Sequence, residues 1–261
     1  MPDLTDWNQR ANTYDTLGWV HGDGLDWTAR LAIGAIQEAI ERTGVNRVLE
    51  VGCGTGALTE RLANEGYCLH AVDVSERMIA RARERVGTRV GQVGYYRIDA
   101  DDQLPPWDYA AIVSRMVLHH APCEPGEQIA RWAPILPPGG ALIVAEGPPP
   151  TTDDRHDAVH LYRAAMALKE PGRHVLHAYQ VAEWMLDAGC VEVRVDERWT
   201  EGNSVRNWLA GGGIEPARAE AILALHREAS PTARKVYRIE ETPDGDVLMR
   251  WRSCVVTGIR G

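Results

Sequence analysis

The stretch RVLEVGCGTGALTERLA, residues 47–63, joins an apolar run to a helical pattern through three alternating glycines. Its first five residues have the β-rich, apolar character of a short buried strand, and the residues after the glycines repeat at helical spacing. Glycines at such a junction let a ligand approach the backbone closely. Two motifs overlap here. The pattern G-x-G-x-x-A, starting at Gly52, fits a dinucleotide-binding fingerprint, whereas E-x-G-x-G-x-G, starting at Glu50, fits a different cofactor.

Strand and helix patterns alternate on both sides of this stretch. Apolar, β-rich runs predict strands at 47–51, 69–75, 94–101, from 109 onward, and at 141–147. Apolar residues at helical spacing predict helices at 24–44, 56–66, 76–87 and 126–136. Regular alternation of this kind is typical of a parallel, doubly wound α/β sheet with right-handed crossovers.

The alternation breaks after the three prolines at 148–150. Beyond them the patterns predict helices at 154–170 and 177–190, a strand at 191–199, a helical excursion from about 204 to 237, and a last strand at 246–260. We therefore expect a core with an N-terminal helical segment (1–147), a cap insertion (148–180), and the end of the core sheet (181–261) with a second cap insertion at about 203–238.

The composition argues against several classes of protein. The formal net charge is -9 and Lys and Arg form no dense run, so a nucleic-acid partner is not expected. No stretch approaches the roughly 18 apolar residues of a membrane span, and the first residues lack the features of a signal peptide. Five scattered cysteines suggest neither a disulfide framework nor a zinc site. These features predict a soluble, cytoplasmic protein with neither a nucleic-acid nor a membrane partner.

The charge at the glycine loop separates the two cofactors. The carboxylate of Glu50, at the mouth of the loop, would repel a pyrophosphate, which a helix N-terminus otherwise favours. The same carboxylate would attract S-adenosylmethionine, which carries a sulfonium and an ammonium group and no phosphate. Asp73 ends the second predicted strand and could hold ribose hydroxyls in either cofactor. Asp99 ends the third strand and could accept a hydrogen bond from an adenine amino group. The balance favours S-adenosylmethionine.

Five segments together resemble class I S-adenosylmethionine-dependent methyltransferases in order and spacing: LEVGCGTGALTERLA, AVDVSERMIARAR, YRIDADDQLP, IVSRMVLHH and LPPGGALIVAE. The chain looks most similar to the small-molecule group that includes ubiquinone and menaquinone biosynthesis enzymes, over about residues 7–147. The resemblance implies a Rossmann-like, doubly wound, seven-stranded sheet with an antiparallel last strand and a mainly helical cap.

The resemblance also implies which residues contact the cofactor. These are Glu50, Gly52, Gly54, Gly56, Ser114 and Arg115 for the methionine part, Asp73 for the ribose, and Val74, Asp99 and Ala100 for the adenine. Tyr14, in the segment WNQRANTYD, corresponds to a tyrosine that folds over the cofactor in this group. An ordinary core aromatic would have the same amphipathic surroundings, so that alternative stays open for Tyr14.

His119 and His120 follow the fourth predicted strand, beside the expected position of the methyl group. Methyl transfer is an in-line displacement, so the enzyme mainly aligns the reactants, and a base helps when the acceptor is a hydroxyl group. Glu146 ends the neighbouring strand and could orient a histidine and support its charged form. We therefore predict His119, with His120 and Glu146, as the catalytic group. The alternative is that these residues only end their strands and cap the next turn.

Further histidines occur in the expected cap. Arg173, His174 and His177 either receive an acidic group of the substrate or, the interpretation that we prefer, link two helices. His156 and His160 share a helix face, but the sequence shows no third and fourth ligand, so no metal is expected.

The predicted function is methyl transfer from S-adenosylmethionine to a small organic acceptor, first of all at oxygen with histidine-assisted deprotonation, with carbon or nitrogen as alternatives. Three other functions stay open: a cyclase or isomerase with the same cofactor, an inactive cofactor-binding partner, and an NAD-dependent dehydrogenase. Glu50 and the lack of a second nucleotide-binding half argue against the dehydrogenase. The sequence leaves the acceptor and the oligomeric state open, a homodimer being one option.

Overall fold

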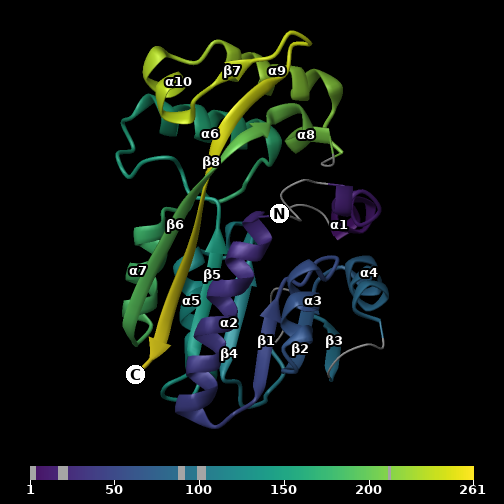
Figure 1. Ribbon diagram of the computed structural model, residues 1–261, viewed down its shortest axis with the longest axis vertical. Coiled ribbons are helices and arrows are strands. Elements are labelled where there is room, and N and C mark those ends of the chain that lie inside the picture. The colour runs from purple at the N-terminus through teal and green to yellow at the C-terminus, as the bar shows by residue number, and fades with distance from the viewer. Residues whose placement is uncertain (1–3, 17–22, 88–91, 99–103, 211–212) are drawn as a thin grey trace.

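The computed structural model describes residues 4–16, 23–87, 92–98, 104–210 and 213–261, whose strands form one eight-stranded sheet (Figure 1). The strands are β1 (Arg47–Val51), β2 (Cys68–Asp73), β3 (Val93–Arg97), β4 (Ala111–Arg115), β5 (Ala141–Glu146), β6 (Cys190–Ser204), β7 (Glu240–Glu241) and β8 (Val247–Arg260). Their order across the sheet is β3-β2-β1-β4-β5-β8-β6, with β7 paired to β8 beside this path. The order reverses between β1 and β4, which is where open α/β sheets bind their ligands.

Strands β1 to β5 are parallel, and β8 is antiparallel to both β5 and β6. The interior residues of the parallel strands, such as Leu49, Ile112 and Ile143, are fully buried because helices cover both faces of the sheet. The predicted doubly wound sheet with an antiparallel last strand is therefore confirmed. The two-residue strand β7 is an addition that the sequence patterns did not indicate.

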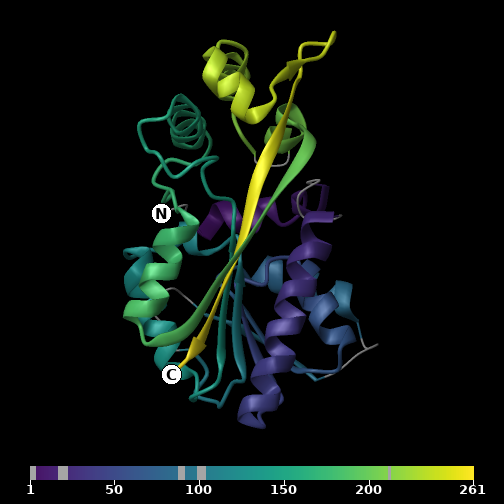
Figure 2. The same ribbon diagram turned by 60° about the vertical axis from the view of Figure 1, so that its left-hand side comes forward.

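Helices form a layer on each face of the sheet (Figures 1 and 2). The first layer contains α2 (Asp23–Thr43) and α3 (Ala57–Asn64), and the second contains α5 (Pro125–Trp132) and α7 (Ala178–Asp187). Helix α4 (Glu76–Val86) packs against β2 and β3. Helix α2 ends where predicted, because Gly44 has a left-handed φ of 71° that stops the helix.

Strands β6 and β8 continue beyond the sheet as a long two-stranded ribbon (Figures 1 and 2). Strand β8 pairs with β6 from Arg260 to Leu248, and the C-terminal half of β8 also pairs with β5 on its other side. The predicted strand at 191–199 is thus too short. The residues after it include Gly202, with a φ of 68°, and look like a turn in sequence. They instead form an irregularity between Thr200 and Asn203, after which the pairing resumes.

A helical cap surrounds the far end of this ribbon. It consists of α6 (Asp157–Lys169), α8 (Val205–Ala210), α9 (Pro216–Arg227) and α10 (Pro231–Tyr237), which share an apolar core with β8. The helical excursion predicted from about 204 to 237 is thus present as three helices. Of its predicted glycine joint, Gly213 is described, and residues 211–212 lie outside the described part of the chain.

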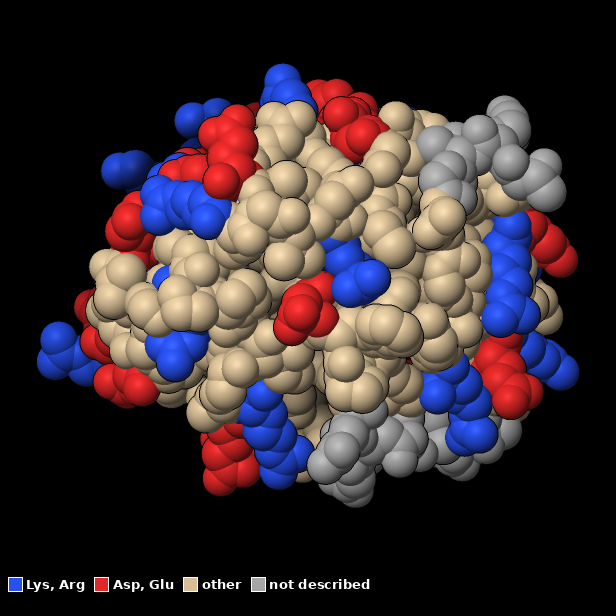
Figure 3. Space-filling model, turned by 90° about the horizontal axis from the view of Figure 1, so that it is seen from below, with Lys and Arg blue, Asp and Glu red and all other residues tan. Residues whose placement is uncertain are grey.

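The N-terminal segment lies beside the junction of core and cap (Figure 1). It contains α1 (Leu4–Arg10) and the short helix η1 (Tyr14–Thr16). Among the described residues, no helix has both the length and the apolar character that crossing a membrane requires. On the face opposite the cap, basic and acidic side chains alternate around the margin and do not form a patch of one sign (Figure 3).

Candidate active site

The loop between β1 and α3 is a backbone cradle that requires glycine. Gly52, Gly54 and Gly56 all have a left-handed φ, at 72°, 52° and 83°. A Cβ atom on Gly56 would lie 2.8 Å from the Cα of Ala82, and one on Gly52 would collide with the side chain of Val117. Helix α3 begins directly behind the loop, so its free amide groups and positive dipole end face the same space.

Two buried polar atoms lie unpartnered where β1 and β4 end beside each other. Within the described part of the chain, Glu50 Oε2 and Ser114 Oγ have no hydrogen-bond partner. Burial raises the pKa of Glu50 to about 8. Orphaned polar atoms of this kind cost free energy in the folded chain unless a ligand satisfies them. Their position at the reversal of the strand order makes them candidate ligand contacts.

Asp73 braces the glycine loop from the end of β2. Its carboxylate accepts hydrogen bonds from the backbone N–H of Gly54 at 2.8 Å and of Ser75 at 2.9 Å. Burial raises the pKa of Asp73, while these hydrogen bonds oppose the shift. Val74 follows Asp73 in the loop after the strand. Asp99 and Ala100, the other predicted adenine contacts, lie outside the described residues.

The N-terminal segment fastens Tyr14 over this loop. The ring of Tyr14 comes within 3.8 Å of the position that a Cβ on Gly54 would take. The neighbouring Asp15 accepts hydrogen bonds from Thr55 at 2.6 Å and from Arg85 at 2.5 Å. Tyr14 therefore lies beside the glycine loop and also packs against the apolar core between helices and sheet, so both interpretations of this residue stay open.

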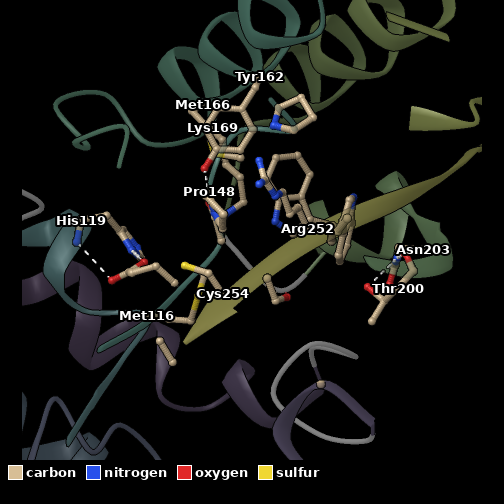
Figure 4. A pocket seen from close by; sticks show the side chains of 18 of the residues that line it. Met116, His119, Pro148, Tyr162, Met166, Lys169, Thr200, Asn203, Arg252 and Cys254 are labelled. Atoms are coloured by element: carbon tan, nitrogen blue, oxygen red, sulfur yellow. Dashed lines mark hydrogen bonds and ion pairs between the residues drawn. The ribbon is translucent and has the colours of Figure 1, made fainter. Parts of the chain in front are cut away.

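His119 and Glu146 form a buried pair at the ends of β4 and β5. His119 Nδ1 lies 2.6 Å from Glu146 Oε2 (Figure 4). Burial lowers the pKa of His119, with a smaller contribution from Arg173, so the ring is neutral near pH 7. Burial alone would raise the pKa of Glu146, but the contact with His119 leaves it below its usual range. Because an ionised carboxylate only accepts, we assign the hydrogen to Nδ1, which leaves Nε2 as an acceptor.

His120 lies beside this pair without joining it. Burial and the neighbouring His119 lower the pKa of His120 to about 2. Its ring packs edge-on against Trp7 of α1, with the ring centroids 4.9 Å apart. The structure thus brings the three predicted catalytic residues to one place but pairs only His119 with Glu146.

Three cations converge on the single carboxylate of Glu170, where α6 ends. Lys169 and Arg173 pair with it at 2.7 and 2.9 Å, and Arg10 of α1 lies 3.5 Å away. All four side chains are largely buried. Burial opposes ionisation of Glu170, but the cations hold its pKa far below the usual range. Lys169 and Arg173 together exceed the one negative charge of Glu170. The group of Arg10, Lys169, Arg173 and Glu170, which we call the cation cluster, therefore has a positive surplus that suits an anion.

The cation cluster argues against a metal ion at the neighbouring histidines. Ligand atoms of His119, His120 and Glu170 lie within 4.8 Å of one another, a spacing that one ion could bridge. The cations already paired with Glu170 would repel a divalent ion there.

The remaining cap histidines have structural roles. His174 contacts the backbone carbonyl of Ala121 at 3.2 Å, and His177 caps α7 and pairs with Asp154. The interpretation as a linker fits these two, whereas Arg173, from the same segment, faces the cavity and belongs to the cation cluster. His156 caps α6 and His160 is exposed.

A cavity of about 580 Å³ connects these groups with the cap (Figure 4). At the core end its wall includes Tyr14, Arg115, His119 and Glu146, together with the cation cluster. At the cap end the wall is built from α6, α8, α9, α10 and β8. Tyr14 lies between this cavity and the glycine loop, so a cofactor on the loop and an acceptor in the cavity would meet beside His119.

Comparison with known proteins assigns the chain to a class. Residues 48–140 match the family model described as a methyltransferase domain. Trans-aconitate 2-methyltransferase from Mycobacterium tuberculosis (strain ATCC 25177 / H37Ra) is 30% identical over 241 residues, which cover 82% of this chain and 87% of that protein. The chain belongs to the class I S-adenosylmethionine-dependent methyltransferases. It is a small-molecule methyltransferase with S-adenosylmethionine as cofactor, which decides between the two cofactors that the glycine pattern left open.

Other comparisons agree on the relatives and the fold. The trans-aconitate 2-methyltransferase of Rhodococcus jostii (strain RHA1) is 28% identical, over 83% of this chain and 89% of that protein. The crystal structure of YcgJ from Bacillus subtilis superposes with a TM-score of 0.70 at 16% identity, over 87% of this chain and 98% of that one. Magnesium protoporphyrin IX methyltransferase from Synechocystis gives a TM-score of 0.55 at 15% identity, over 99% and 98%.

Part of the charged wall at the core end of the cavity was not predicted from the sequence. Lys169 and Glu170 were not predicted as site residues, and Arg173 was assigned to a linker in preference to the substrate. One feature could have indicated Lys169: it is one of two lysines in a chain whose other basic residues are arginines. Its position at the end of an amphipathic helix gave no indication of what it would face.

Proposed function

We propose that the protein methylates an oxygen atom of a small organic acid, most directly a carboxylate oxygen. The observation that carries this proposal is the cation cluster of Arg10, Lys169 and Arg173 beside His119. Buried cations attract an anion and fix its orientation through charge-assisted hydrogen bonds. When bound, S-adenosylmethionine supplies an electrophilic methyl group, so an ionised acceptor needs alignment more than it needs a base.

The residues around the glycine loop fit the methionine and ribose parts of the cofactor. The unpartnered oxygen of Glu50 suits the ammonium group, and the free amides at the start of α3 suit its carboxylate. Asp73 accepts two backbone hydrogen bonds and keeps further lone pairs for the ribose hydroxyls. Tyr14 covers this site from the N-terminal segment. We retain Gly52, Gly54 and Gly56 as the cradle itself.

The other contacts complete this assignment. Ser114 and Arg115, at the end of β4, would line the methionine part, and Val74 would lie beside the adenine. Asp99 and Ala100 stay predicted contacts of the adenine edge. An orphaned hydroxyl such as that of Ser114 is the kind of group that a bound ligand satisfies.

His119 is positioned to remove a proton from the acceptor. With its Nδ1 hydrogen held by Glu146, the neutral ring offers Nε2 as a base. An acid that enters protonated would lose its proton to Nε2, and the resulting imidazolium would be stabilised by Glu146. For an acceptor that is already ionised, His119 would instead help to position it.

The relatives agree with an acidic acceptor. Trans-aconitate, named in the Mycobacterium and Rhodococcus proteins, is a carboxylic acid, and those proteins match most of this chain. A ubiquinone biosynthesis O-methyltransferase from Caulobacter is 35% identical over 103 residues, 38% of this chain and 40% of that protein. The trans-aconitate methyltransferases and the ubiquinone biosynthesis O-methyltransferase both support transfer to oxygen.

The type of bond formed tests the proposal. The purified protein is incubated with methyl-labelled S-adenosylmethionine and a series of mono-, di- and tricarboxylic acids. A methyl ester releases labelled methanol in mild alkali, and we expect this behaviour. Arg173→Met should raise KM for the acid about tenfold or more and leave binding of S-adenosylhomocysteine unchanged, because it removes a charge-assisted hydrogen bond. Arg163→Met is the matched control, since Arg163 forms an exposed pair on α6, the helix that precedes Arg173. Alkali-stable label in the product would contradict ester formation.

A hydroxyl acceptor is the second candidate, and the His119–Glu146 pair is the observation that favours it. In that case the product is an alkali-stable ether, and His119 must remove the hydroxyl proton. His119→Gln would then lower kcat by about 100-fold or more, and kcat of the wild type would fall at acidic pH as His119 is protonated. A carboxylate acceptor should show neither effect at that size.

A further inference from the structure

The two ends of the cavity differ in chemistry. The core end is charged, whereas the cap end is a chamber with aromatic and thioether walls, which we call the cap chamber. Its wall residues are Met166 (α6), Trp208 (α8), His226 (α9), Tyr237 (α10), and Met249 and Trp251 (β8). Such walls favour an apolar or aromatic group over a carboxylate.

Two tryptophans form an open aromatic corner in the chamber. The rings of Trp208 and Trp251 have centroids 5.9 Å apart and planes inclined by 58°. The ammonium group of Lys169 lies 4.9 Å from the centroid of Trp208 and also pairs with Glu170. Lys169 therefore marks the boundary between the cation cluster and the cap chamber. A ligand that places its carboxylate at the cluster would extend its other end onto these rings.

The other cations near the chamber are engaged by the protein itself. Arg252 donates to the carbonyl of Pro149 at 3.1 Å and pairs with Glu197 at 2.6 Å. Arg198 donates to the carbonyl of Asp23 at 3.1 Å and lies over the ring of Trp27. Of these two cations Arg252 is neutralised by Glu197, so a second or third carboxylate in the cap chamber would meet tryptophan faces and, of this pair, the charge of Arg198 alone. This disfavours a compact polycarboxylate as the natural acceptor.

His226 adds a specific polar contact to the chamber. It is 3% exposed, and its Nδ1 lies 2.7 Å from the carbonyl of Ile222, so the ring hydrogen is on Nδ1. Burial lowers the pKa of His226, so the ring is neutral. No described residue hydrogen-bonds Nε2, which is left as an acceptor in the cavity wall. By contrast, the hydroxyl of Tyr237 is already donated to Ala158.

We propose that the acceptor is an aryl-substituted monocarboxylic acid whose ring packs against the faces of Trp208 and Trp251 and donates a hydroxyl or amino hydrogen to His226 Nε2. This inference rests on the proposed carboxylate acceptor. His226 then acts as a specificity residue. A site with a buried acceptor discriminates strongly against an analogue that lacks the matching donor, because the acceptor is left unpaired.

Binding of three acids in the presence of S-adenosylhomocysteine tests this without turnover. The probes are 3-(4-hydroxyphenyl)propanoate, 3-phenylpropanoate and trans-aconitate, titrated calorimetrically and by tryptophan fluorescence. We expect the hydroxylated acid to bind about tenfold more tightly than 3-phenylpropanoate, and trans-aconitate to bind most weakly. His226→Leu should bring the two aryl acids to within about twofold of each other. His226→Gln, whose amide oxygen can accept, should keep part of the preference.

Controls separate folding from specificity. His160→Leu replaces an exposed histidine on α6 and should leave the ratio between the aryl acids unchanged. Each variant must bind S-adenosylhomocysteine as the wild type does, and if His226→Leu fails this criterion, His226→Gln decides the comparison.

The outcomes distinguish this inference from the proposed function. If trans-aconitate binds most tightly and becomes an ester, the proposed function stands and the cap-chamber inference is overturned. Equal binding of the two aryl acids to the wild type would overturn the role of His226. If no acid of either class binds or is methylated, both proposals fail together.

Discussion

Glu50 is a buried carboxyl whose charge state depends on pH. Its pKa is about 8 in the folded chain, against an ordinary value of 4.5, because burial disfavours the charge. Between these values the folded state binds a proton that the unfolded state has lost. The contribution of Glu50 to the free energy of unfolding therefore decreases as the pH rises from 4.5 to 8.

We expect Glu50→Gln to remove this dependence, because glutamine does not titrate. Relative to the wild type, the variant should gain stability from pH 5 to pH 8, by up to about 1.4 kcal/mol per pH unit. Urea unfolding of both proteins across this range measures the difference. Glu65→Gln, at an exposed position after α3, is the control and should show no such trend. A Glu50→Gln difference that is independent of pH would contradict the buried, protonated carboxyl.

Cofactor binding should show the opposite pH trend in the wild type. The ammonium group of S-adenosylhomocysteine prefers an ionised Glu50, so binding below pH 8 releases a proton. Affinity should therefore rise with pH towards 8 and become weaker and flatter in Glu50→Gln, as calorimetry in buffers of different ionisation enthalpy can measure.

At the scale of elements, the short helix η1 is held to the cofactor loop and α4 through Asp15. Its hydrogen bonds to Thr55 and Arg85 fix the segment that carries Tyr14. Asp15→Asn should weaken binding of S-adenosylhomocysteine about tenfold, because it weakens two charge-assisted hydrogen bonds that hold this cover in place. Stability should change by less than about 1 kcal/mol, since the pair is partly exposed.

Calorimetry and thermal unfolding together check the prediction for Asp15. The matched control is Glu84→Gln, which alters an exposed pair with Arg81 on the same helix α4 and should affect neither quantity. A variant that binds the cofactor like the wild type would show that η1 does not act as a cover. A large loss of stability would show that it belongs to the core.

Local patterns predicted the elements well where each element is self-contained. Helix α2 and strands β1, β2 and β5 lie within one or two residues of the predicted ranges because their apolar periodicity directly reflects burial. The extension of β6 past Trp199 was missed because pairing with β8, distant in sequence, overrides the turn-like residues around Gly202.

The site was predictable to the extent that it lies on core strands. Glu50 and Asp73 lie at the ends of β1 and β2, and His119 follows β4, so their meeting point follows from the topology of the sheet. The cation cluster brings together the end of α6 and the N-terminal helix α1, so residues far apart in sequence share one carboxylate. No local sequence pattern predicts these contacts, because they depend on how the cap packs against the core.

At the scale of the whole molecule, the paired strands β6 and β8 run from the core into the cap and connect the two. Both strands belong to the sheet at one end, and at the other end β8, still paired with β6, contributes to the apolar core of the cap. We therefore expect one cooperative unfolding transition. Pulse-labelled hydrogen exchange in urea should give peptides from 216–227 in the cap and 23–43 in the core the same midpoint.

A core substitution makes this expectation specific. Val256 is fully buried in the sheet part of β8, and Val256→Ala should cost about 2 kcal/mol through the cavity that it leaves. Both sets of peptides should then shift to the same lower urea concentration. A cap midpoint that stays in place, or that lies below the core midpoint in the wild type, would show that the cap folds as a separate unit.

The paired ends of the ribbon also matter for protein engineering. Ser204 and Leu248 are opposite each other in the pairing of β6 with β8. The chain between them therefore leaves the ribbon and returns to it at one pair of neighbouring residues. A replacement segment of different length or sequence would join the ribbon at the same two residues. The cofactor loop follows β1, which β4 and β5 separate from the ribbon, so this site would keep its structure. Related enzymes could therefore vary residues 205–247, and with them part of the acceptor cavity, provided that the contacts of this segment with α6 are kept.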